Sequence, residues 1–194
     1  MDTITGLPAH PFLAHIPVIL LPLAVLGIVL MVIKPAWHQR YRWAVLAVTA
    51  VGAIGTVFVA EAGEKLEDRI VAIEGAAARA GWEDHAEAGD TARLFAMLFL
   101  VVVLAYILVP FFLERRAKAA GKAVGADTMT APATGPKWLR PVLSALVLLA
   151  AAGSLVTVIQ AGHSGSKSVW KEVVDQSNEK INGGTPADGD NDGG

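Results

Sequence analysis

Four long stretches of the chain are apolar and almost free of charged residues, and polar segments separate them. These stretches are residues 11–33, 43–61, 92–113 and 140–161, to within a few positions. Each is close to the ~20 residues that a helix needs to cross the hydrocarbon core of a bilayer. The pattern therefore predicts an all-α integral membrane protein built as a four-helix bundle.

The polar connection between the second and third spans also has a helical pattern. Three apolar residues recur there at helical spacing among charged ones: Leu66, Ile70 and Ile73. This spacing is typical of an amphipathic helix. Gly81 interrupts the pattern, and Glu83 or Asp84 can cap a new helix that contains His85 and continues into the third span. We therefore expect an outer helical cap between helices 2 and 3.

After the fourth span the chain becomes polar again. A short apolar stripe follows, suited to the membrane surface or to the cap: Val169, Trp170, Val173 and Val174. The last residues are rich in Gly, Asp and Asn, which cannot bury enough apolar surface to fold. The sequence thus predicts a transmembrane domain over residues 1–175 and a disordered acidic tail over 176–194.

Composition agrees with a membrane protein and excludes several other classes. Hydrophobic residues make up 54% of the chain, and the mean hydropathy is +0.49. The absence of cysteine excludes disulfides, thiolate metal sites and covalent haem attachment. A net charge of -2 argues against nucleic-acid binding, because the basic residues lie mostly where membrane topology requires them.

The charges of the connecting segments predict the orientation, because short cytoplasmic loops collect Lys and Arg. The loop at 34–42 holds three basic residues and no acid, and the segment 114–140 holds six basic residues against two acids. By contrast, the segment 61–90 holds nine acids against three bases. We therefore expect a multi-pass protein of the cell membrane with both termini outside the cytoplasm.

Histidines are the main candidates for chemistry, because an ionisable residue near the membrane core needs a partner. Four of the five are expected at the outer end of the bundle: His10, His15, His85 and His163. His15 is the firmest candidate, since it lies about four residues, or roughly 6 Å, inside the first span. His163 lies at a comparable height. His85 lies about 13 Å above the boundary unless the cap folds back.

The remaining polar candidates carry less weight. His38 is interpreted as a solvated residue of the inner loop. Glu61 and Glu64 lie one helical turn apart and are candidate metal ligands. We favour the alternative that they belong to a solvated negative face, with Arg93 as an ion-pair partner. No nucleophile elbow, phosphate loop or HExxH motif is present, so catalysis is the least favoured class.

Three interpretations of the outer histidines follow. They could bind a b-type haem for electron exchange with an outer redox partner, as imidazoles in helical bundles do. They could instead bind zinc, copper or iron together with Glu61 or Glu64. In the third interpretation no cofactor is bound, and the bundle is a structural or accessory subunit of a membrane complex.

Several motifs resemble those of the bacterial predicted membrane proteins grouped as domain of unknown function 2231. The first helix opens with His10-Pro11-x3-His15-x-Pro17, and further motifs are Gly-Glu-x-Leu-Glu from Gly63, His85-x3-Gly89 and Gly162-His163-Ser164-Gly165 followed by Val169-Trp170. The resemblance spans residues 8–170. It implies a four-helix membrane protein in which the matched histidines are important, and it implies no particular activity.

Overall fold

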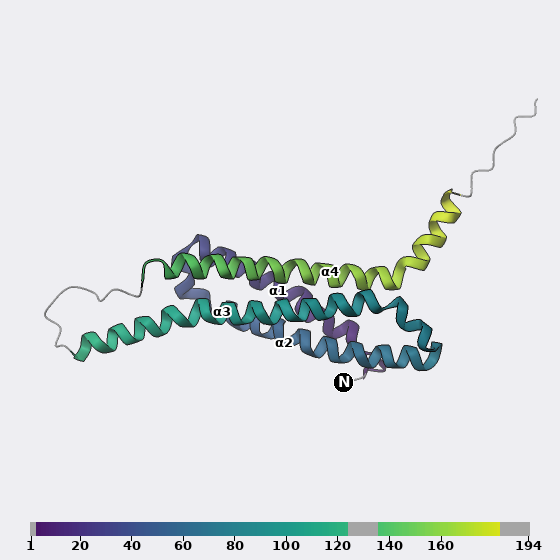
Figure 1. The fold of residues 1–194 in the computed structure, drawn as a ribbon, viewed down its shortest axis with the longest axis horizontal. Coiled ribbons are helices and arrows are strands. Elements are labelled where there is room, and N and C mark those ends of the chain that lie inside the picture. The colour runs from purple at the N-terminus through teal and green to yellow at the C-terminus, as the bar shows by residue number, and fades with distance from the viewer. Residues whose placement is uncertain (1–2, 124–135, 183–194) are drawn as a thin grey trace, which may run out of the picture.

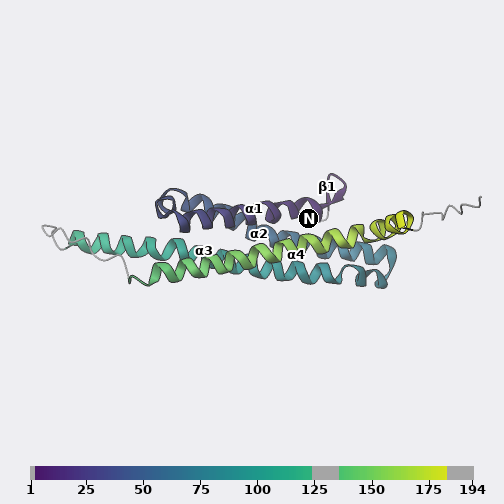
Figure 2. The same cartoon turned by 90° about the horizontal axis from the view of Figure 1, so that it is seen from above.

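The computed structural model describes residues 3–123 and 136–182. Its main elements are α1 (Ala9–Ile33), α2 (Pro35–Glu74), the 3-10 helix η1 (Ala76–Gly81), α3 (Glu83–Ala123) and α4 (Leu139–Asn182). All four α-helices run along one long axis (Figure 1 and Figure 2). A two-residue antiparallel hairpin of β1 (Thr3–Ile4) and β2 (Leu7–Pro8), which the sequence did not indicate, precedes α1.

The predicted fold class is confirmed. Each helix packs against the next along the chain, and α4 also packs against α1, so that α1 and α3 face one another across the bundle. All four α-helices are long and apolar enough to cross a membrane. Large apolar side chains on their outer faces, such as Leu149 at 70% exposure, are exposed in the isolated chain, as expected for a surface that contacts lipid.

The connection between α1 and α2 is much shorter than the predicted loop at 34–42. Only Lys34 lies between the two helices, and Pro35 occupies the first turn of α2. Proline is favoured there, because its fixed φ angle suits a helix and its missing N–H needs no partner. The helix therefore starts eight residues before the apolar span.

The cap between α2 and α3 forms as α2 continues past its apolar span to Glu74. Gly75 ends the helix with φ of 90°, a conformation that favours glycine. The chain then turns back alongside α2 as η1, where Arg79 forms an ion pair of 2.6 Å with Glu67 (Figure 1). After this return α3 starts close to the first turn of α1, where His85 contacts His10.

The core consists of residues that point to the bundle axis from all four helices. Its largest fully buried apolar side chains are Phe99, Leu21, Ile28, Met31, Ile107, Val103 and Val147. Gly52 and Gly153 allow close helix packing around this core. An added Cβ would lie 3.1 Å from Leu21 at Gly52 and 2.7 Å from Phe95 at Gly153.

The last part of α4 leaves the bundle. Residues 171–181 are all exposed, and Figure 1 shows this yellow segment bending away from the other helices. The apolar stripe near Trp170, which is 59% exposed, therefore does not lie on the cap. The helix also covers 176–182 of the predicted tail, while residues 183–194 lie outside the described residues.

Candidate site of paired histidines

His10 lies in the first turn of α1 and is half-buried against α2. Its Nδ1 atom is 2.9 Å from the backbone carbonyl oxygen of Val59. The ring can approach α2 this closely because the neighbouring position is Gly63, where an added Cβ would lie 2.9 Å from the same nitrogen. His10 thus depends on a glycine in the Gly-Glu-x-Leu-Glu motif.

His85 lies in the first turn of α3 and contacts α4 in a similar way. Its Nδ1 atom is 3.2 Å from the hydroxyl oxygen of Ser164. A Cβ added at Gly165 would lie 2.8 Å from the Cε1 atom of His85. Here too a glycine leaves the space that the imidazole ring occupies.

The two rings meet at the end of the bundle. Their centroids are 5.8 Å apart and their planes are inclined by 86°, an edge-to-face contact. His10 and His85 come from the diagonal helices α1 and α3, while their hydrogen-bond acceptors come from α2 and α4. All four helices therefore contribute to one site.

The hydrogen bond of His10 assigns its tautomer. A carbonyl oxygen only accepts hydrogen bonds, so Nδ1 of His10 donates to Val59. In the neutral state its Nε2 atom then carries a lone pair. His85 contacts two groups of α4, the hydroxyl of Ser164 at Nδ1 and the backbone of Ala161.

The electrostatic environment of His85 favours its neutral form. Burial lowers the pKa of His85 below its ordinary value of 6.5, and the neighbouring His10 lowers it further, while a hydrogen bond to the backbone of Ala161 partly opposes the shift. Desolvation and a like charge both disfavour the imidazolium form. A neutral imidazole is the form that binds a metal.

The other two outer histidines do not join this pair. His15 is exposed, and its Nδ1 lies 2.8 Å from the carbonyl oxygen of Pro11 in its own helix. His15, the firmest candidate from the sequence because of its depth in the first span, therefore does not point into the bundle. His163 is exposed as well, although the adjacent Ser164 takes part in the site.

The acidic candidates also lie on the surface. Glu61 and Glu64 are both exposed, and Glu61 forms an ion pair of 2.9 Å with Lys65. We expected Arg93 to pair with these two glutamates. It pairs instead with Asp90 at 3.1 Å. Among residues 3–123 and 136–182, no group of three or more metal-ligating side chains is close enough to hold an ion.

At the opposite end of the bundle, His38 is buried rather than solvated. Only 8% of its surface is exposed, and its ring lies edge-to-face with Tyr106 at a centroid distance of 5.2 Å. It also forms a hydrogen bond with the backbone of Tyr106. That carbonyl lacks its usual helical donor, because Pro110, four residues later in α3, has no N–H.

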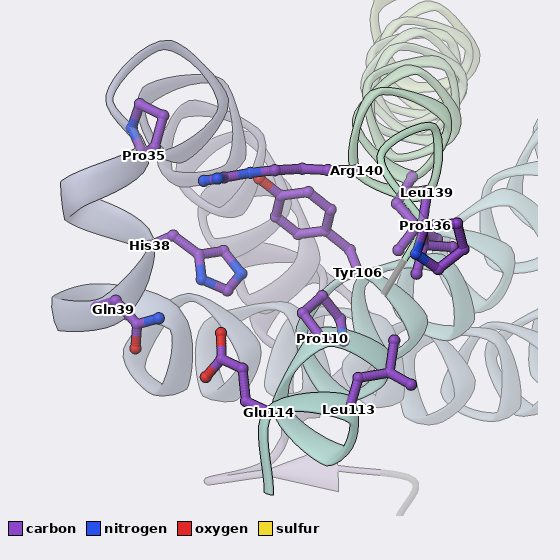
Figure 3. Close-up of a pocket in the computed structure, with 11 residues that line it drawn as sticks. Pro35, His38, Gln39, Tyr106, Pro110, Leu113, Glu114, Pro136, Leu139 and Arg140 are labelled. Carbon is purple, nitrogen blue, oxygen red and sulfur yellow. The ribbon is translucent and has the colours of Figure 1, made fainter. Parts of the chain in front are cut away.

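His38 also borders a cavity of about 140 Å³. Figure 3 shows its ring between Arg140 above and Glu114 below. The sequence interpretation missed this site because it placed His38 in a loop. A signal was present, since His38 lies seven residues before Val45 and eleven before Thr49, both of which face the bundle axis.

Fold and site together define a membrane four-helix bundle closed at one end by a histidine pair. The sequence profile of a family described as predicted membrane protein (DUF2231) matches residues 6–178. The chain therefore belongs to this family, as its motifs indicated. No curated protein and no solved structure matches the chain.

Proposed function

We propose that this protein is a membrane haem protein, in which His10 and His85 bind the iron of one b-type haem and serve a redox partner at that membrane face. The observation that supports this most is the way in which the rings are held. Nδ1 of each ring contacts a hydrogen-bonding group of a neighbouring helix, the carbonyl of Val59 for His10 and the hydroxyl of Ser164 for His85. Metal-binding histidines are usually oriented by such a hydrogen bond on the other ring nitrogen.

The number of ligands favours haem over a bare metal ion. Zinc sites use three or four protein ligands, whereas a porphyrin supplies four nitrogens and needs only one or two axial residues. The described residues bring two imidazoles together and no larger group. A b-type haem is therefore the better match to this donor set, and a zinc, copper or iron ion is the weaker alternative.

The two imidazoles are close enough to serve one iron. Their ring centroids are 5.8 Å apart. His10 and His85 would be the residues that hold the haem, and the haem would supply the one-electron chemistry.

A b-type haem would supply reversible one-electron chemistry at this position. The contribution of the chain would be to hold two imidazoles on separate helices, each in contact with a neighbouring helix. The opposite end holds a single histidine, His38, already packed against Tyr106. We therefore propose electron exchange on one face and not across the membrane.

The charged residues at the two ends of the bundle indicate the side of the membrane on which the histidine pair lies. The end that holds Lys34, Arg40 and Arg42 is the basic one, whereas the cap beside the histidine pair is acidic. Positive residues favour the cytoplasmic side. We propose that the histidine pair lies on the outer face of the cell membrane.

An absorption spectrum tests the proposal. The protein is purified in detergent, spectra are recorded in the oxidised and reduced states, and bound metals are measured on the same sample. We expect a Soret band, a shift on reduction and about one iron per chain. Stoichiometric zinc or copper without a chromophore would support the bare metal site instead, and a protein free of both would leave the pair as a polar contact between α1 and α3.

A further inference from the structure

The cavity beside His38 has a charge arrangement that the histidine pair does not explain. Its walls come from α2, α3 and α4, and its polar lining residues are His38, Gln39, Tyr106, Glu114 and Arg140. Its volume of about 140 Å³ exceeds the ≈30 Å³ share of one water molecule several-fold. It is therefore large enough for a small polar group.

Two opposite charges face this cavity without pairing to each other. Within the described residues, neither Arg140 nor Glu114 has an ion-pair partner. Figure 3 shows the two side chains on opposite sides of the His38 ring. A cavity with a guanidinium on one wall and a carboxylate on the other is complementary to a ligand that carries both charges.

The region near Arg140 is suited to the negative part of such a ligand. Guanidinium groups bind phosphate oxygens with two parallel hydrogen bonds. Pro35 and Leu139, the first residues of α2 and α4, also line the cavity, so the positive ends of two helix dipoles lie there. His38 adds no charge, because burial and the nearby Arg42 and Arg140 lower its pKa.

The location points to lipid as the source of the ligand. The charged lining residues lie at the ends of apolar spans, Glu114 directly after the third and Arg140 at the start of the fourth, which is where headgroups are expected. Apolar side chains complete the wall and can contact the hydrophobic part of a lipid: Pro110, Leu113, Pro136, Leu139 and Leu143. Basic pockets between transmembrane helices commonly bind lipid headgroups.

We propose that this cavity binds the zwitterionic headgroup of a phospholipid with a primary ammonium group, its phosphate on Arg140 and its ammonium on Glu114. An anionic headgroup without the ammonium would leave the carboxylate of Glu114 unpaired. A choline headgroup has no N–H to donate to it. The site is independent of the histidine pair at the other end of the bundle.

Native mass spectrometry of the full-length protein tests this with equal amounts of phosphatidylethanolamine, phosphatidylglycerol and phosphatidylcholine. We expect several-fold greater retention of the ethanolamine lipid. Arg140→Gln should lower its retention by about tenfold, as expected for loss of roughly 1.4 kcal/mol. Arg116→Gln is the matched control, because Arg116 is exposed and does not line the cavity.

Glu114→Gln should abolish the preference for ethanolamine over glycerol headgroups. This change of preference is measured within one sample, so general misfolding does not mimic it. Soluble phosphoethanolamine should displace the lipid, which would identify the headgroup as the bound part. Equal retention of the three lipids by the wild type, equal effects of Arg140→Gln and Arg116→Gln, or equally effective competition by inorganic phosphate would overturn the proposal.

Discussion

Two glycines determine how closely the imidazoles of His10 and His85 approach the neighbouring helices. Gly63 and Gly165 lie opposite ring atoms, and an added Cβ at either would come within 3 Å of them. In a helix interior glycine is less favourable than alanine by about 1 kcal/mol. Glycine at these two positions therefore lowers the stability of the helices and leaves room for the imidazole rings.

Gly165→Ala should destabilise the protein, since the new Cβ would overlap the ring of His85. Overpacking of this kind costs about 1–3 kcal/mol. Gly162→Ala is the matched control on the same helix, because nothing lies within 4 Å of its added Cβ. Thermal unfolding in detergent should show a lower Tm for the first variant and an unchanged or higher Tm for the second. A higher Tm in both would show that the ring is not packed against Gly165.

A second prediction concerns the titration of His38. Burial, with Arg42 and Arg140, lowers its pKa in the folded state below the ordinary value of 6.5, against smaller opposing effects of Tyr106 and Glu114. The unfolded state then binds more protons, so the stabilisation from neutral His38 is present above pH 6.5 and is lost as the pH falls below it. His38→Gln should show a smaller loss of Tm between pH 8 and pH 5 than the wild type. Identical pH profiles would contradict the burial of this ring.

The sequence identified the histidines as candidates, but it could not show which of them meet in the fold. His10 and His85 were among the candidates, yet His15 was ranked first because of its depth. His15 is five positions after His10, which corresponds to a rotation of about 140° around a helix. The two side chains therefore cannot both face the bundle axis. The direction in which α1 faces depends on its packing against α2, and that packing is visible only in three dimensions.

At the scale of elements, the connections decide which side chains meet. The apolar spans predicted four membrane-crossing helices, and the amphipathic pattern predicted a helical cap between the second and third. The return of η1 along α2 depends on Gly75 and on the Arg79–Glu67 ion pair, a contact between residues twelve positions apart. Because of this return His85 reaches His10. By contrast, the single-residue turn at Lys34 was not anticipated, and His38 was therefore assigned to a loop.

The extension of α4 should be dispensable for the stability of the bundle. Residues 171–181 are all exposed, and such residues contribute little to the free energy of unfolding. A chain that ends after Ser168 should therefore keep the Tm of the full-length protein and elute as one species. A fall in Tm of many degrees would show that this segment packs against the bundle.

The whole molecule has two chemically different ends. Basic residues gather near the turn between α1 and α2 and at the start of α4, whereas the cap is acidic. The histidine pair belongs to the acidic end and the His38 cavity to the basic end. The two proposed sites therefore lie at opposite ends of the bundle.

The natural absence of cysteine allows this sidedness to be measured directly. Ala80→Cys in η1 and Ala36→Cys in the first turn of α2 place single thiols at exposed positions on the two ends. In intact cells a membrane-impermeant maleimide should label the first thiol and reach the second only after permeabilisation. The reverse pattern would place the histidine pair in the cytoplasm.

The central claim is that His10 and His85 together bind one haem, and the haem content of matched double variants tests it most directly. His10→Ala/His85→Ala removes the pair, whereas His15→Ala/His163→Ala removes the two exposed histidines at the same end. After haem-replete expression, the haem-to-protein ratio should be close to one for the wild type and for the second variant, and close to zero for the first. Equal ratios in both variants, or no haem in the wild type, would contradict the account.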